Sequence, residues 1–88
     1  MSAVTVQASF YPLRQDKLSP SIEAALEVFA RHGIERKTGT MSTLLWGDDE
    51  KVFPALLDAF RRVASLGEAV MVVTVSNACP WPGENGSR

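Results

Sequence analysis

The sequence is poor in the residues that usually build metal, redox and nucleic-acid sites. It holds one cysteine, Cys79, and one histidine, His32. A lone cysteine cannot form a disulfide within the chain, so we expect a reducing, cytoplasmic setting and no metal site. Nine lysines and arginines stand against ten acidic residues. Because nucleic acid and anionic membranes attract clustered positive charge, this balance argues against both as the main partner.

Long apolar runs and catalytic motifs are missing as well. The longest apolar run, AVMVVTV at 69–75, is far too short for membrane insertion, and the N-terminus does not have the pattern of a signal peptide. The chain contains no phosphate-binding loop, dinucleotide-binding glycine turn or HExxH motif. His32 and Cys79 have no catalytic partner nearby in the sequence. We therefore expect no enzyme, no catalytic residue and no cofactor.

What the sequence does contain is an alternation of strand and helix patterns. In the first helix, Ser19 suits the N-cap, Pro20 the first turn and Gly33 the left-handed stop. Helical spacing of apolar residues predicts helices at 19–32 and 50–66. Period-two alternation predicts a first strand at 3–13 and a last strand at 68–77. Between the helices, residues 34–48 are predicted to form two strands joined by a turn near 39–41.

This order of elements predicts an α+β, ferredoxin-like fold, β-α-β-β-α-β. In that fold a four-stranded antiparallel sheet has the strand order 4-1-3-2, and the two helices cover one face. We expect residues 1–80 to form one such domain. Residues 81–88 are rich in proline and glycine, and we expect them to form a flexible tail.

The face of the sheet without helices, called the open face below, has an unusual predicted composition. Alternation along the first, third and last strands places on it Thr5, Gln7, Ser9, Tyr11, Ser42, Leu44, Trp46, Val70, Val72, Thr74 and Ser76. None of these side chains is charged, and the ERK run at 35–37 is expected to be a solvated strand face. Uncharged polar groups among apolar walls are typical of a small-molecule site.

The last strand adds an expectation about partners. Its apolar residues occupy both faces, with Ala69, Met71, Val73 and Val75 toward the helices, and it is predicted at a sheet edge. An exposed apolar edge strand tends to pair with another chain. We expect a homodimer or homotetramer whose subunits meet through open faces or edge strands, with a pocket between them. A dry interface without a ligand fits the pattern equally well.

Three segments resemble a known family in their order and placement. FYPL after the first strand, MSTLLWGD across the third and VVTVSNACP on the last are similar to the YkoF-like thiamine-binding family, over roughly Val4 to Pro80. The resemblance implies a ferredoxin-like subunit that forms dimers or tetramers. It also implies binding of thiamine or its hydroxymethylpyrimidine part, for uptake or salvage, without catalysis.

The resemblance and the open face together define a predicted ligand site. MSTLLWGD and VSNACP imply roles for Ser42, Thr43, Trp46, Asp48, Ser76 and Asn77. On the open face, Gln7, Ser9, Ser42 and Thr74 suit the donor–acceptor edge of an aminopyrimidine, and Tyr11 or Trp46 suits its flat face. Thr40, in the predicted turn, completes the set.

Other interpretations of these segments stay open. Asp48, together with Asp49, also suits the cap of the second helix, which the pattern favours over ligand contact. Members of the family often carry a glutamate where this chain has Leu44 to Trp46, so contacts to the ligand's amino group or cationic ring are expected to differ. The alternative function is a regulatory or structural module of the same fold that binds another metabolite or a protein. An RNA-binding sheet would need basic residues, which the predicted open face lacks.

Overall fold

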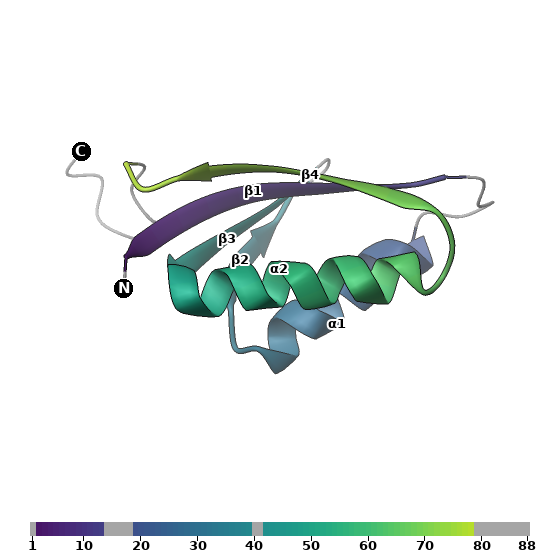
Figure 1. Ribbon diagram of the computed structural model, residues 1–88, viewed down its shortest axis with the longest axis horizontal. Coiled ribbons are helices and arrows are strands. Elements are labelled where there is room, and N and C mark those ends of the chain that lie inside the picture. The colour runs from purple at the N-terminus through teal and green to yellow at the C-terminus, as the bar shows by residue number, and fades with distance from the viewer. Residues whose placement is uncertain (1, 14–18, 40–41, 79–88) are drawn as a thin grey trace.

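The structure, a computed structural model, describes residues 2–13, 19–39 and 42–78. The predicted elements are all present, close to their predicted bounds (Figure 1). They are β1 Ala3–Pro12, α1 Ser19–Arg31, β2 Glu35–Thr38, β3 Thr43–Asp48, α2 Asp49–Ala64 and β4 Ala69–Ser76. The predicted tail at 81–88, Cys79 and Thr40 lie outside the described residues.

The strands form one antiparallel sheet in the order β2-β3-β1-β4. Both helices lie on the same side of this sheet (Figure 1). This is the ferredoxin-like arrangement, and it confirms the predicted fold class and strand order. One face of the sheet is therefore covered by α1 and α2, and the open face is left without helices.

A left-handed turn at Gly33 ends α1, as the sequence predicts. The Gly33 N–H donates to the Ala30 carbonyl at 3.0 Å, and the Ile34 N–H donates to the Phe29 carbonyl at 3.0 Å. These two bonds are those of a Schellman motif, which needs a positive φ, here 69° at Gly33. The turn leads Ile34 directly into the core.

The start of α2 is held by backbone contacts to the start of β1. Asp48 is the N-cap residue, as predicted, but its side chain makes no capping hydrogen bond. The Asp49 N–H donates to the Ser2 carbonyl at 2.7 Å, and Asp49 Oδ1 accepts from the Ser2 N–H at 3.2 Å. Asp49, rather than Asp48, therefore makes the side-chain contact at this helix end.

The core lies between the sheet and the two helices. Val6 from β1, Leu45 from β3, Phe29 from α1 and Val52 from α2 are fully buried in it. The rings of Phe10 and Phe29 are tilted against each other by 46°, with centroids 6.3 Å apart. Burying one such side chain stabilises the fold by roughly 1.5–3 kcal/mol. Alternation in β1 and β3 thus supplies one apolar face to the core and leaves the other face open.

β4 carries apolar side chains that the helices do not cover. Val73 and Val75 lie on the helix-facing side of the strand, as predicted, yet they are 36% and 41% exposed. The helix layer packs against only the first part of this side, at Ala69 and Met71. Because β4 is the edge strand, nothing else in the described chain covers the rest.

Candidate functional site

The strand register brings four side chains of the open face into one row. Gln7 on β1 lies opposite Leu44 on β3 and opposite Thr74 on β4. Lys37 on β2 lies opposite Leu44. Neighbouring strands are about 4.8 Å apart, so this row crosses the whole sheet in roughly 14 Å. An amide, a hydroxyl, an ammonium group and a leucine therefore face the same side, within reach of one small ligand.

A hollow of about 320 Å³ lies at the β2 side of this row. It is lined by Gln7, Lys37, Gly39, Ser42 and Leu44, and we call it the open-face hollow. The Gly39 N–H donates to the Ser42 carbonyl at 2.8 Å, which closes the turn between β2 and β3 beside it. The structure thus brings together two of the predicted site residues, Gln7 on β1 and Ser42 just before β3.

Lys37 is a lining residue that the sequence analysis missed. The prediction of an uncharged open face is wrong at its β2 edge, where Glu35 and Lys37 both lie on that face. The reason is the hairpin register, because Thr38 pairs with Thr43 and Lys37 consequently pairs with Leu44. The available signal was the length of the connection between the two strands. The number of residues between Thr38 and Thr43 determines which residues of β2 and β3 pair.

A second row lies beside the first, toward the beginning of β1. Thr5 lies opposite Trp46 and Ser76, and Glu35 lies opposite Trp46. The Thr5 hydroxyl oxygen is buried and has no hydrogen-bond partner among the described residues. A buried hydroxyl in that state costs free energy until water or a ligand binds it. The Ser76 hydroxyl oxygen, by contrast, already accepts from the Ala78 N–H at 2.9 Å.

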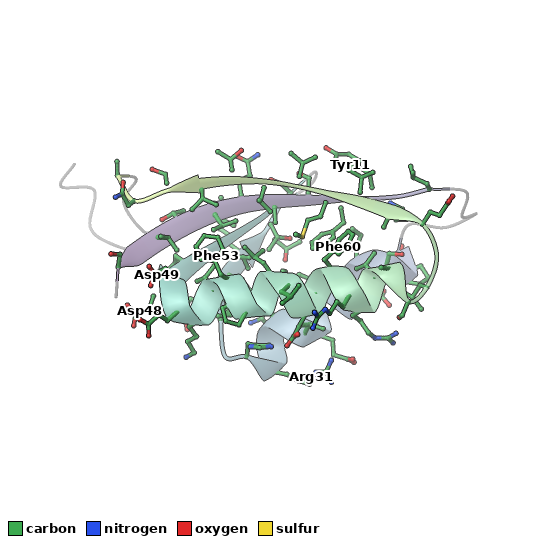
Figure 2. All side chains as sticks on the ribbon, viewed as in Figure 1. Tyr11, Arg31, Asp48, Asp49, Phe53 and Phe60 are labelled. Carbon is green, nitrogen blue, oxygen red and sulfur yellow. The ribbon has the colours of Figure 1, made fainter. Side chains whose placement is uncertain are left out.

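Two further predicted residues, Ser9 and Tyr11, continue along β1 beyond the hollow. Ser9 lies opposite Val72, and Tyr11 lies opposite Val70. Tyr11 is exposed and projects from the side of the sheet opposite the helices (Figure 2). Both residues share the open face with the hollow, but neither lines it.

Three further predicted residues that the structure describes, Thr43, Asp48 and Asn77, do not line the open-face hollow. Thr43, for which the family resemblance implied a ligand role, is only 6% exposed and faces the helices, as its alternation with Ser42 and Leu44 predicts. Asp48 lies at the helix layer, at the start of α2 (Figure 2). Asn77 is exposed just after β4.

The open-face hollow offers hydrogen-bonding groups, an apolar surface and one positive charge to a small ligand. The Gln7 amide and the Ser42 hydroxyl can each donate and accept a hydrogen bond. Leu44 supplies an apolar surface between them, and Lys37 supplies a positive charge. None of the five described lining residues carries a carboxylate or an imidazole.

A larger hollow, of about 420 Å³, lies on the helix side of the molecule. It is lined by Val28, Arg31, His32, Asp58 and Arg62, and Figure 2 shows Arg31 pointing away from the sheet. His32 Nε2 lies 2.8 Å from Asp58 Oδ2. His32 has no partner nearby in the sequence, as expected, but α2 supplies one from 26 residues away. No serine, threonine or cysteine is among the lining residues, so this pair has no nucleophile to activate there.

Two structural features are absent from the described ranges, 2–13, 19–39 and 42–78. No helix in them is long and apolar enough to cross a membrane. They also contain no cluster of three or more side chains suited to bind a metal ion.

The chain is similar to several solved structures. A hypothetical protein from Methanocaldococcus jannaschii, MJ1052, is 25% identical, with a TM-score of 0.80 over 97% of this chain and 88% of that one. A domain of unknown function, DUF77, from Bacillus cereus is 20% identical, with a TM-score of 0.75 over 85% and 75%. A candidate thiamine biosynthesis/salvage protein from Thermotoga maritima, TM0486, is 21% identical, with a TM-score of 0.76 over 84% and 82%. No curated protein matches the sequence.

The fold and the helix-free sheet face define a small ferredoxin-like domain. A designed protein with the ferredoxin fold also matches it, with a TM-score of 0.60. The model of the YKOF-related family matches residues 3–82, which is most of the chain. The protein therefore belongs to the YKOF-related family. This confirms the family resemblance inferred from the FYPL, MSTLLWGD and VVTVSNACP segments.

Proposed function

We propose that the protein binds thiamine or its hydroxymethylpyrimidine part in the open-face hollow, without catalysing a reaction. Membership of the YKOF-related family and the likeness to a candidate thiamine biosynthesis/salvage protein support a thiamine-related role. The observation that carries the proposed site is the hollow itself, where Gln7 and Ser42 meet around Leu44. The proposed role is vitamin uptake or salvage in the cytoplasm, with no bound cofactor.

The size and lining of the hollow support a single aromatic ring as the bound part. Its 320 Å³ lies at the low end of the range of roughly 300–1,000 Å³ that is usual for small-ligand sites. An aminopyrimidine presents donors and acceptors along its edge, which the Gln7 amide and the Ser42 hydroxyl can match. Its flat apolar face then rests on Leu44. Trp46, in the neighbouring row, offers an aromatic surface to a thiazolium ring outside the hollow.

The proposed pocket lies near an interface between identical subunits. β4 exposes Val70 and Val72 on the open face and Val73 and Val75 on the other face. An exposed apolar edge is stabilised when another strand pairs with it. Pairing of two β4 edges would extend the sheet and place two open faces side by side in a homodimer. Two such dimers meeting through these faces would form a homotetramer.

The alternative is a regulatory or structural oligomeric module that binds another small metabolite or a protein partner. The exposed apolar side chains of β4 support this function too, because an interface needs no small ligand. The two functions differ in the expected role of Gln7 and Ser42. In a pocket these side chains contact a ligand, whereas in a plain interface they contribute only to association.

Titration calorimetry of the purified protein with hydroxymethylpyrimidine, and separately with thiamine, tests the proposal. We expect saturable binding near one ligand per subunit. Gln7→Ala and Ser42→Ala should each weaken it by about fivefold, the effect of losing one hydrogen bond, and leave the oligomer intact. Thr38→Ala, on the helix-facing side of β2, is the matched control and should bind normally. Absence of heat with both ligands at several temperatures would contradict the proposed function.

A further inference from the structure

The charge of the open-face hollow is set by Lys37. It is the one charged side chain among the five that line the hollow. The acidic residue on the same face of β2, Glu35, lies opposite Trp46 in the next row and does not line the hollow. Residues two apart on a strand are separated by about 6.6 Å, and the described residues show no ion pair between Glu35 and Lys37. The ammonium group is therefore available to a ligand.

The row of side chains through the hollow fixes the position of the Lys37 charge relative to a pyrimidine ring bound there. Lys37 and Gln7 lie two strands apart, about 9.6 Å between their backbones, with Leu44 between them. A ring that rests on Leu44 and offers one edge to Gln7 has its opposite side toward β2. A substituent on that opposite side lies within reach of the Lys37 ammonium group.

This geometry points to a more specific ligand, and the inference rests on the proposed function. We infer that the ligand bound most tightly is an aminopyrimidine carrying an anionic substituent, of which a phosphate ester is the simplest example. The ring contacts Leu44 and Gln7, and the anionic group pairs with Lys37. Lysine binds a phosphate group as a compact point charge that donates hydrogen bonds, which strengthens the contact relative to a neutral pair.

The same charge acts against a cationic group in the hollow. The thiazolium ring of thiamine is positive, and like charges near each other repel, so this ring has to lie outside the hollow, away from Lys37. For neutral hydroxymethylpyrimidine, the Lys37 charge adds neither attraction nor repulsion. The order of affinity therefore distinguishes the three compounds, with the phosphate ester first.

The test is calorimetric titration of wild-type protein with hydroxymethylpyrimidine phosphate, with neutral hydroxymethylpyrimidine and with inorganic phosphate. We expect the ester to bind about fivefold more tightly than the neutral compound, as for a partly exposed ion pair, and inorganic phosphate to bind far more weakly than the ester. Raising the salt concentration should reduce the advantage of the ester, because salt screens the charge pair.

Three variants of β2 separate the position of the charge from its mere presence. Lys37→Ala should abolish the difference in affinity between the ester and neutral hydroxymethylpyrimidine. Arg36→Ala removes one positive charge from the adjacent position on the opposite, helix-facing side, and should keep the advantage. Lys37→Arg preserves the charge and should retain most of the higher affinity for the ester. Circular dichroism spectra of all three variants verify that each is folded.

The possible outcomes distinguish this inference from the proposed function. Equal binding of the ester and the neutral compound by wild-type protein, or an advantage that survives Lys37→Ala, would overturn the inference and leave the proposed pyrimidine site standing. Inorganic phosphate that binds as tightly as the ester would also overturn it, since the ring would then contribute nothing. Failure of both pyrimidines to bind would overturn the inference and the proposed function together.

Discussion

Gln7 on β1 and Leu44 on β3 are cross-strand neighbours on the face of the sheet that neither helix covers. One position away, Val6 and Leu45 are also paired, and both are fully buried beneath the helices. Because successive side chains of a strand point to opposite faces, the same alternation builds both the core and the open-face hollow. A shift of register by one residue would exchange the two sets of side chains, so the packing of the core fixes the geometry of the hollow.

The first prediction concerns the core beneath this pair. Leu45→Ala should lower the free energy of unfolding by about 2–5 kcal/mol, because it leaves a cavity at a fully buried position. Leu57→Ala is the matched control. Leu57 is 49% exposed on α2, and its truncation should change stability by no more than about 0.5 kcal/mol. Urea unfolding followed by circular dichroism measures both variants, and equal losses would contradict the placement of the core.

A second prediction concerns the turn that ends α1. Gly33→Ala should destabilise the protein by about 1–2 kcal/mol, because a Cβ at φ 69° crowds the following carbonyl oxygen. Gly33→Asn should cost less, since asparagine tolerates this conformation better than alanine. Thermal unfolding of the two variants shows which of them is more stable. An alanine variant as stable as the wild type would show that the Schellman turn is not formed.

The contact between His32 and Asp58 gives a third prediction. His32 and Asp58 lie at the solvent-exposed side of the helix layer, so their coupling energy in a double-mutant cycle should be only about 0.2–1 kcal/mol. His32→Ala should leave binding of hydroxymethylpyrimidine unchanged, because the pair lies across the molecule from the open-face hollow. A loss of ligand binding in this variant, with the fold intact, would move the site to the helix side.

A fourth prediction concerns the exposed edge of the sheet. Val73→Lys should weaken self-association, because a charged side chain on an edge strand opposes pairing with another chain. Thr38→Lys places the same charge on β2, the other edge of the sheet, and serves as the control. Sedimentation velocity over a range of concentrations compares the two variants. Equal association of Val73→Lys and wild-type protein would exclude β4 from the interface.

Most of the fold could be predicted from the sequence because its signals are local. The alternation of Val4, Val6, Ala8 and Phe10 is uninterrupted in β1, and all four are buried as predicted. The stop at Gly33 needs only its immediate neighbours. By contrast, the uncovered part of β4 depends on how far the helix layer reaches over the sheet edge, which the sequence of the strand does not contain.

The site could be predicted only in part, because it depends on pairings between segments. Gln7 and Ser42 were found because alternation in each segment places them on the side of the sheet away from the helices. Lys37 was missed because its place beside Leu44 follows from the exact length of the β2–β3 turn. The partner of His32 was missed for a related reason, since Asp58 lies 26 residues away and only helix packing brings the two together.

The most direct test of the proposed site is a titration of the isotopically labelled protein with hydroxymethylpyrimidine, followed by backbone amide chemical shifts. We expect saturable shifts at Gln7, Lys37 and Leu44, around the open-face hollow. Amides of the helix-side hollow, near His32 and Asp58, should stay unchanged. Shifts confined to the helix side, or no saturable shifts at ligand concentrations well above those of the protein, would contradict a ligand site on the open face.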